Sequence, residues 1–275
     1  MHIDFIANDA RTQSAKKVLD RSHTVRSGLL FSSADTPPDA LVLPIPPTRD
    51  GCTLTGSSYT LADCRSALIH AKKMPMLLGY GACPAPLLFA DYCDLSKDEA
   101  FVCANAELTA EGGMMLLEGF LSERGLSLYR QAAVILGYGR IARAMAARLA
   151  SNGCAVLVGA RRAEAREAAR EATYLPFDCT DKDFFCGRGR LLFAERAHIL
   201  VNTVPDPSVI PTLAKMPNPL CALELSGKSD VLAACQELPY PTLDGKAIPT
   251  RFFPQTAGEL LAKAIASCLD GSVSQ

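Results

Sequence analysis

Residues 132–162 read AAVILGYGRIARAMAARLASNGCAVLVGARR, and this stretch decides the fold. It joins a buried strand, a glycine turn, an amphipathic helix and a second strand at the spacing of a dinucleotide-binding unit. Gly137 permits a tight bend, Gly139 lets the backbone approach a pyrophosphate, and Ala142 stands where a third glycine is common. Free N–H groups at the helix start favour an anion. The pattern predicts that the cofactor is bound by Gly137, Tyr138, Gly139, Arg140 and Ile141.

The second strand of this unit, Ala155–Val158, indicates which nucleotide is bound. It runs into Gly159-Ala160-Arg161-Arg162, where NAD-binding chains usually carry an acid for the ribose hydroxyls. Two guanidinium groups suit a 2′-phosphate, which arginine binds through two hydrogen bonds, so the predicted cofactor is NADP(H). Alternatively, Arg161 and Arg162 only begin the next, highly charged helix.

The composition permits this architecture and excludes other classes. A chain of 275 residues with 49% hydrophobic content can bury the cores of two domains. The 28 basic and 29 acidic residues nearly cancel, so no basic field indicates a nucleic-acid partner. We expect no membrane span, because no apolar run approaches about 18 residues. The early charges of MHIDFIANDAR are unlike a signal peptide, and we expect a cytoplasmic protein.

Cysteine and histidine are scattered along the chain. The eleven cysteines form no C-x-x-C pair and have no neighbouring histidine cluster, so we predict no metal site and expect reduced, mostly buried thiols. The four histidines are equally dispersed. His198 precedes an apolar strand, and we interpret it as a strand-edge residue rather than a general base.

The predicted fold class is α/β: a doubly wound Rossmann-type NADP-binding domain and a smaller N-terminal α/β domain, joined by a long helix. We expect an N-terminal domain at 1–105, a linking helix at 106–127, the Rossmann domain at 128–250 and a C-terminal helix at 251–275. In the N-terminal domain, apolar runs and helical spacing predict strands at Ile3–Ala7, Ala40–Leu43 and Met76–Leu78, and helices at Thr12–Leu19 and Leu61–Lys72.

The Rossmann domain continues beyond the arginine pair. Further strands are predicted at Thr173–Phe177, Ile199–Val204 and Cys221–Leu225, with a short helix at Leu191–Arg196. The fourth strand ends near the expected nicotinamide position, so the cofactor is predicted to contact Asn202, Thr203, Val204 and Pro205. Alternatively, this tetrapeptide is a simple proline-terminated turn.

Two helix starts carry polar residues of interest. The linking helix is predicted to begin at Leu108, which makes Thr109 its candidate N-cap. Glu111 lies only two residues further on, so a capping box does not explain it and it is available to a ligand or a cation. Thr256 and Glu259 have capping-box spacing before a final apolar helix, which we expect to pack against the first domain or the linking helix.

Six short motifs follow one another along the chain: Asn8-Asp9-Ala10-Arg11, NAELTAEG at 105–112, Leu136–Arg140, Val158–Arg161, Val201–Pro205 and Pro254–Gly258. In this order they resemble one family, the A subunits of dipicolinate synthase, over nearly the whole chain. The Thr-Ala-Glu-Gly and terminal Thr-Ala-Gly elements are more specific than the glycine turn, which many dehydrogenases share. The chain departs from the family after the fifth strand, where Ser226–Asp230 replaces a Pro-Gly-Gly turn.

The resemblance implies an oxidoreductase of sporulating bacteria that converts a dihydrodipicolinate-level intermediate of the lysine pathway to dipicolinate, with NADP⁺ accepting the hydride. It also implies that the partner is a smaller, flavoprotein-like B subunit, and a homodimer is possible. A small dicarboxylate substrate needs cations, for which Arg11, Arg251 and Lys228 are the candidates, with Thr256 beside the substrate.

The same chemistry needs a base to remove a proton while the two rings are held in contact. Glu111 is the candidate base, Thr109 a hydrogen-bonding positioner, and Lys228 an alternative acid or carboxylate clamp. Two other functions stay open. One is another two-domain dehydrogenase of shikimate or 2-hydroxyacid type, although no histidine follows His198 to serve the latter. The other is a non-catalytic NADP(H)-binding scaffold subunit.

Overall fold

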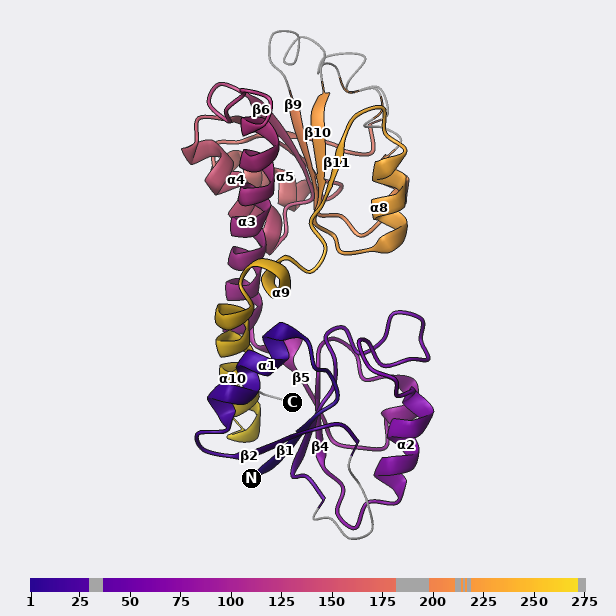
Figure 1. The fold of residues 1–275 in the computed structure, drawn as a ribbon. Coiled ribbons are helices and arrows are strands. Elements are labelled where there is room, and N and C mark those ends of the chain that lie inside the picture. Colours follow the sequence, from indigo (N-terminus) through magenta and orange to yellow (C-terminus); the bar gives the residue numbers. More distant parts are fainter. Residues whose placement is uncertain (30–36, 182–197, 211–213, 215, 217–218, 272–275) are drawn as a thin grey trace. The chain divides into compact units, whose positions relative to one another are not determined.

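The computed structural model describes residues 1–29, 37–181, 198–210, 214, 216 and 219–271 (Figure 1). The chain divides into two compact units. Unit 1 comprises Met1–Asn105 and Pro249–Gln275, and unit 2 comprises Ala106–Ile248. Both contain a parallel sheet with helices, which confirms the α/β class.

Unit 1 is built on a five-stranded parallel sheet in the order β2-β1-β3-β4-β5. Three of these strands were predicted, with ends that shift by up to two residues. β2 and β5 were missed, because they are short edge strands without a long apolar run. The strands are β1 (His2–Phe5), β2 (Thr24–Ser27), β3 (Ala40–Val42), β4 (Met76–Gly79) and β5 (Tyr92–Asp94).

Two of the helices in unit 1 begin at side-chain caps. The Asp9 carboxylate accepts a hydrogen bond from the Thr12 amide and starts α1 (Ala10–Leu19). A full capping box between Thr60 and Asp63 starts α2 (Leu61–Ile69), which ends three residues before the predicted Lys72. Two 3-10 turns, η1 (Ala85–Leu87) and η2 (Leu95–Lys97), precede and follow β5.

The period-two pattern of the strands divides the apolar side chains of unit 1 between two cores. Ile3, Phe5 and Val42 lie in a core that includes residues of α1 and α10 (Pro254–Leu269). Leu41 and Leu77 belong to a second core together with residues of α2. Helices therefore cover both faces of the sheet, as a fully buried parallel sheet requires.

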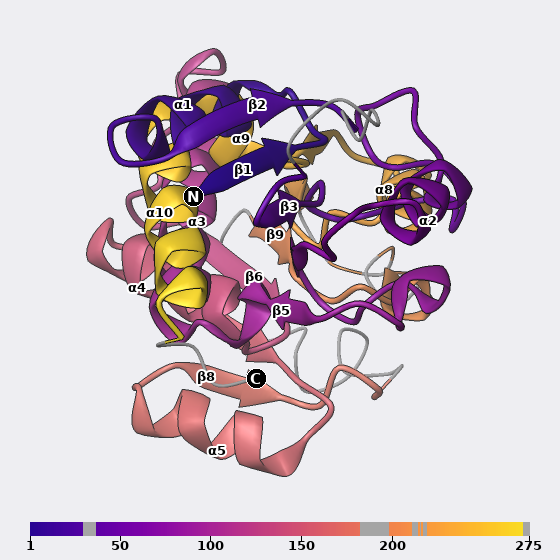
Figure 2. The ribbon, with the colours of Figure 1, turned by 90° about the horizontal axis from the view of Figure 1, so that it is seen from below.

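The pairing of α1 with α10 is the main helix contact of unit 1, and Figures 1 and 2 show the two helices side by side. A Cβ added at Gly258 would lie 2.7 Å from the Arg11 carbonyl oxygen and 2.8 Å from the Ala15 nitrogen. The glycine of the terminal Thr-Ala-Gly motif is thus required by the close approach of two helices. The expectation that the last helix packs against the first domain is confirmed.

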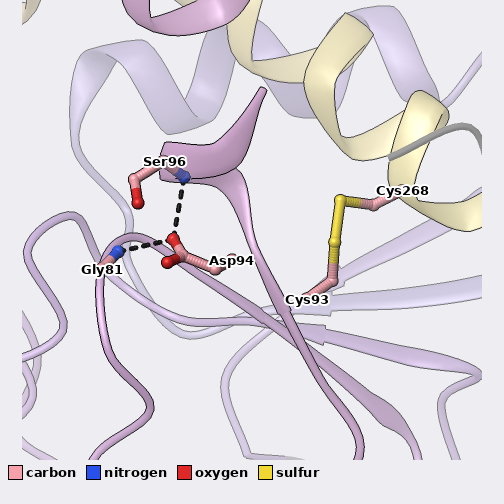
Figure 3. The surroundings of a disulfide bond; sticks show 5 residues. All are labelled: Gly81, Cys93, Asp94, Ser96 and Cys268. Atoms are coloured by element: carbon pink, nitrogen blue, oxygen red, sulfur yellow. Dashed lines mark hydrogen bonds between the residues drawn. A yellow bond between two sulfur atoms is a disulfide. The ribbon is translucent and has the colours of Figure 1, made fainter. Parts of the chain in front are cut away.

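A disulfide bond joins Cys93 of β5 to Cys268 near the end of α10 (Figure 3). The expectation of reduced thiols is wrong for this pair. Nothing in the local spacing of the cysteines indicated it, because the two residues are 175 positions apart and meet only in the fold. Seven further cysteines in the described part of the chain are free thiols: Cys52, Cys64, Cys83, Cys154, Cys179, Cys221 and Cys235.

Unit 2 contains a six-stranded parallel sheet in the order β11-β10-β9-β6-β7-β8. The chain runs outward from β6 to β8, then crosses to β9 and continues to β11. This is the doubly wound topology, and its switch point lies between β6 and β9. The strands are β6 (Ala132–Leu136), β7 (Ala155–Gly159), β8 (Leu175–Phe177), β9 (His198–Asn202), β10 (Pro219–Glu224) and β11 (Thr242–Asp244).

Three further helices accompany this sheet: α4 (Arg140–Ser151), α5 (Ala163–Glu171) and α8 (Ser229–Gln236). A 3-10 turn, η3 (Pro207–Val209), follows β9, and α9 (Ile248–Phe252) lies where the chain returns to unit 1. The strand β11 was not predicted, and the helix predicted at Leu191–Arg196 lies outside the described residues.

The long helix α3 (Glu99–Ser122) starts nine residues before the predicted Leu108. The Asp98 carboxylate accepts a hydrogen bond from the Phe101 amide at its true start. The interpretation of Thr109 as an N-cap is therefore wrong, because Thr109 lies in the helix interior and is buried. The helix crosses the boundary between the two units.

Candidate dinucleotide-binding site

The glycine turn lies between β6 and α4, at the switch point of the unit 2 sheet. Gly137 has a φ of +89°, and a Cβ there would lie 2.5 Å from Thr203 Oγ1 and 3.2 Å from a Val204 methyl group. Both the backbone conformation and the neighbouring loop therefore require glycine at this position. The Gly137 amide donates to the Gly159 carbonyl oxygen over 2.8 Å, which ties the turn to the end of β7.

Gly139 differs from Gly137, because neither its backbone conformation nor a neighbouring atom of the protein requires a glycine there. Its φ is −80°, and no heavy atom lies within 4 Å of the Cβ position. The residue is the exposed N-cap of α4 and provides no side-chain cap for the first turn. An open space at the start of a twelve-residue helix, beside uncapped amides, fits a pyrophosphate that approaches the backbone closely.

Tyr138 and its neighbours make the rest of the turn. The Tyr138 ring packs edge-on against Tyr174, with centroids 6.4 Å apart, and the Arg143 guanidinium lies 5.1 Å from its centre. Burial raises the pKa of the Tyr138 hydroxyl, which keeps it neutral. Arg140 is exposed and Ile141 half-buried at the helix start. The Tyr138 side chain thus braces the turn against neighbouring elements.

The two arginines at the end of β7 are exposed, and Arg162 is the N-cap of α5. Arg161 forms an ion pair with Asp206, with an N–O distance of 3.3 Å. Arg166 holds the connecting loop by donating to the Ala160 and Arg161 carbonyl oxygens. An exposed ion pair contributes only about 0–1 kcal/mol, so a phosphate dianion can replace Asp206 as the partner of Arg161.

The segment after β9 packs on the glycine turn. Thr203 donates from its hydroxyl to the Leu136 carbonyl oxygen over 2.7 Å. Asn202 is fully buried, and its amide accepts from the Val204 N–H and donates to the Val204 carbonyl, both at 3.1 Å. The predicted direct contact of Asn202 with a cofactor is therefore revised, because its side chain is turned inward and supports the loop. Val204 is half-buried and Pro205 exposed.

Glu224 was not anticipated from the sequence. It is the last residue of β10, is 2% exposed, and its carboxylate accepts hydrogen bonds of 2.5 Å from Asn202 Nδ2 and from the Ser226 amide. Burial raises the pKa of this carboxyl, against the opposing effect of its hydrogen bonds. An acid inside the apolar run CALEL, at the carboxyl end of a strand, was the available signal.

The candidate catalytic residues all fall in unit 2. Glu111 lies on the exposed side of α3, whereas Thr109 is buried. Gly113, close to both residues in the sequence, lies where α3 packs tightly, since a Cβ there would lie 3.2–3.6 Å from side-chain atoms of Met145, Leu223 and Leu225. Lys228 is exposed at the N-cap of α8, just beyond the end of β10.

The candidate substrate residues fall in unit 1. Arg11 is 7% exposed, its guanidinium lies 3.9 Å from the Asp9 carboxylate, and its Nε has no hydrogen-bond partner among the described residues. Burial lowers its pKa from the ordinary arginine value. Arg251 is exposed, with its guanidinium 5.2 Å from the Phe252 ring centre. The predicted capping box at Thr256 is wrong, because α10 begins at Pro254 and Thr256 lies exposed in its first turn.

Metal clusters and membrane-spanning helices do not occur in the described part of the chain. No group of three or more His, Cys, Asp or Glu residues there could hold a metal ion. No described helix is long and apolar enough to cross a membrane. His198 is fully buried as the first residue of β9, between Ala132 and Pro219, and so lies at the opposite end of the strand from the glycine turn.

A doubly wound parallel sheet with a glycine turn at its switch point, in a chain that also contains a second parallel α/β unit, defines the Rossmann-type fold of two-domain dehydrogenases. No protein-family model matches the chain. No curated protein matches its sequence.

Solved structures give a more particular result. The crystal structure of the dipicolinate synthase A subunit from Bacillus halodurans is similar over 98% of this chain and 97% of its own, with a TM-score of 0.75 and 19% identity. The corresponding structure from Bacillus subtilis is similar over 98% of this chain and 96% of its own, with a TM-score of 0.75 and 18% identity. D-lactate dehydrogenase from Escherichia coli is similar over 98% of both chains, with a TM-score of 0.60 and 11% identity. The expected structural resemblance to the A subunits of dipicolinate synthase is thus confirmed at the level of fold.

Proposed function

We propose that the chain is an NADP-dependent oxidoreductase that forms dipicolinate from a dihydrodipicolinate-level intermediate, as the A subunit of a dipicolinate synthase. The observation that carries the proposal is the open space at Gly139. Its glycine is not needed by the polypeptide, but a pyrophosphate that contacts the first turn of α4 needs it. The fold shared with two A subunits supports the particular reaction.

The nucleotide is held by unit 2. The backbone of the glycine turn binds the pyrophosphate, and Arg161 and Arg162 bind the 2′-phosphate that distinguishes NADP from NAD. Thr203, Val204 and Pro205 line the ribose and nicotinamide end. When bound, the nicotinamide ring accepts the hydride.

The substrate is a dicarboxylate, and the buried Arg11 supports this choice. Its Nε has no hydrogen-bond partner among the residues that the structure describes and its guanidinium lies 3.9 Å from the Asp9 carboxylate, so it retains donors for a substrate carboxylate. Arg251 and Thr256 complete the substrate side. Glu111 removes the proton, Thr109 positions the reactants, and Lys228 clamps the second carboxylate or serves as an acid.

The proposed partner is a flavoprotein-like B subunit, and the expected location is the cytoplasm of a sporulating cell. A 2-hydroxyacid dehydrogenase is disfavoured because His198, the last histidine of the chain, is buried at the wrong end of β9. A scaffold that binds NADP(H) without chemistry would bind the nucleotide but form no dipicolinate.

Calorimetric titration of the whole chain with NADPH tests the nucleotide half. The wild-type chain should bind, and Gly139→Ala should melt at the same temperature but bind at least tenfold more weakly. Gly119→Ala is the matched control, because its Cβ also meets nothing within 4 Å and it lies in a helix remote in sequence from the turn. Absence of NADPH binding by the wild-type chain would overturn the proposal.

Dipicolinate formation from a dihydrodipicolinate source, with and without the B subunit, tests the chemical half. Glu111→Gln should keep NADPH affinity and lower turnover at least tenfold, because the amide cannot accept a proton at that position. Nucleotide binding without dipicolinate formation in either mixture would indicate the scaffold function instead.

A further inference from the structure

We propose that Glu224 is a positioning residue of the nucleotide site: its buried carboxyl fixes the Asn202 amide and, through it, the backbone of Val204, whose side chain packs on the glycine turn. The proposal rests on the proposed binding of NADP(H). It assigns a role to a buried acid that the proposed reaction does not use.

A hydrogen-bond network surrounds the Glu224 carboxyl. One oxygen accepts from Asn202 Nδ2 and the other from the Ser226 amide, both over 2.5 Å. The Cys235 thiol of α8 lies 3.7 Å from the oxygen that Asn202 also uses. Glu224 thus links the ends of β9 and β10 to α8, in surroundings closed to water.

Asn202 continues this network to the glycine turn. Its Nδ2 donates one N–H to the Glu224 carboxyl and the other to the Val204 carbonyl oxygen, while its Oδ1 accepts from the Val204 N–H. Val204 and Thr203 are the residues that a Cβ at Gly137 would strike. Rotation of the Asn202 amide would release both Val204 hydrogen bonds and loosen the segment that lies against the turn.

The network needs a carboxyl rather than an amide at position 224. Both carboxyl oxygens face N–H donors, and an amide offers only one acceptor atom. In a Glu224→Gln variant, the new NH₂ group must face either Asn202 Nδ2 or the Ser226 N–H, and one donor is left unsatisfied in a buried site. A Glu224→Asp variant keeps two acceptor oxygens, but its side chain is shorter by one methylene group, so the oxygens lie further from the Asn202 and Ser226 donors.

A carboxyl that only fills the core would behave differently. The fully buried Cys235 provides the comparison, because its thiol donates to the same carboxyl oxygen and forms no hydrogen bond to Asn202 in the described part of the chain. Its truncation should disturb packing and lower thermal stability, but leave the Asn202–Val204 hydrogen bonds in place. Glu224 and Cys235 variants therefore separate positioning from packing.

The experiment measures the NADPH dissociation constant, the KM for NADP⁺ and the kcat of dipicolinate formation, and the melting temperature of the full-length chain. Glu224→Gln should raise the dissociation constant and KM at least tenfold with a smaller change in kcat, Glu224→Asp should fall between it and the wild type, and Cys235→Ala should change affinity less than twofold. Asn202→Ala should match Glu224→Gln. Their double variant should bind no more weakly than either single variant, because the two residues act in series.

Equal NADPH affinity in wild type, Glu224→Gln and Glu224→Asp would overturn the proposal, as would Cys235→Ala weakening binding as much as Glu224→Gln. If Glu224→Gln does not fold, the Asp and Asn202→Ala variants decide the matter by the same criteria. A wild-type chain that does not bind NADPH would instead reject the proposed function on which this inference depends.

Discussion

Arg161 pairs with the Asp206 carboxylate of its own chain, and in the proposed NADP(H) complex the 2′-phosphate of the nucleotide competes for it. The ion pair is solvent-exposed, with 58% of the arginine side chain accessible, so its contribution is at most about 1 kcal/mol. A bidentate guanidinium–phosphate pair is stronger. We therefore expect the 2′-phosphate of the nucleotide to displace Asp206 from Arg161. Before the nucleotide binds, the ion pair with Asp206 holds the Arg161 side chain in place.

The first prediction concerns cofactor choice. The Arg161→Ala, Arg162→Ala double variant should lose at least tenfold in NADPH affinity and little in NADH affinity, because only NADPH carries the 2′-phosphate. Asp206→Asn should strengthen NADPH binding slightly by removing the competing carboxylate. Parallel calorimetric titrations with both nucleotides measure this, and equal affinities of the wild-type chain for NADPH and NADH would refute it.

The second prediction concerns pH and Glu224. Because burial raises its folded-state pKa above the ordinary glutamate value, the folded chain holds this proton more tightly than the unfolded chain. The protonated Glu224 carboxyl contributes its full stabilisation below the unfolded-state pKa of about 4.3, and this stabilisation is lost as the pH rises through the folded-state pKa. The loss amounts to about 1.4 kcal/mol for each pH unit by which the folded-state pKa exceeds the unfolded-state pKa. The stability advantage of wild type over Glu224→Gln should therefore shrink as the pH is raised from about 4.3 toward neutrality, measured by urea denaturation. A difference independent of pH would contradict this.

At the scale of elements, the terminal Thr-Ala-Gly motif serves helix packing. Gly258 brings the first half of α10 against the backbone of α1, at the carbonyl oxygen of the buried Arg11. The close contacts are with two backbone atoms and with the Ser14 Cβ, which is fixed to the backbone, so none of them can move aside as the end of a flexible side chain can. The motif therefore supports a candidate substrate residue by holding the helix that carries it.

The third prediction follows from that contact. Gly258→Ala should lower the free energy of unfolding by about 1–3 kcal/mol, because overpacking outweighs the gain of about 1 kcal/mol in helix propensity. Gly119→Ala, with open space at its Cβ, should be neutral or stabilising by up to about 1 kcal/mol. Guanidinium denaturation of both variants provides the measurement, and equal effects would show that the α1–α10 contact does not limit stability.

The elements also show what sequence reasoning can recover. In 132–162 the order of strand, glycine turn, helix and strand was predicted correctly, and the second strand was placed to within one residue, because burial and turn chemistry agree there. The strands β2, β5 and β11 were missed, since each has only three or four residues at or near a sheet edge. The start of α3 was misplaced because its cap is Asp98 rather than the more prominent Thr109.

The site was recoverable to a similar extent. Residues that follow each other along the chain, such as the glycine turn and the arginine pair, revealed their arrangement through spacing. The role of Glu224 could not be predicted from spacing, because its carboxyl meets Asn202 and the Ser226 amide only once β9 and β10 pair in the sheet. Sequence patterns report local geometry, whereas a buried polar network depends on tertiary pairing.

At the scale of the whole molecule, unit 1 is assembled from two pieces of chain with all of unit 2 inserted between them. The second piece, 249–275, returns as α10 and contributes to the unit 1 core. The Cys93–Cys268 disulfide joins the two pieces covalently, and both cysteines are nearly buried, at 5% and 4% exposure. A link across so many residues restricts the unfolded chain strongly, while the helix packing already holds the folded one.

The fourth prediction is that this disulfide stabilises unit 1. Cys93→Ser, or full reduction of the wild-type chain, should lower the free energy of unfolding by about 2–4 kcal/mol, because loop closure no longer limits the unfolded state. NADPH affinity should be unchanged, since the turn and the arginine pair belong to unit 2. Guanidinium denaturation with and without reductant measures the effect, and Cys52→Ser, at an exposed free thiol, should respond to reductant as the wild type does. A wild-type midpoint indifferent to reductant would show that the bond contributes nothing, and that the packing of α10 on α1 alone holds the two pieces of unit 1 together.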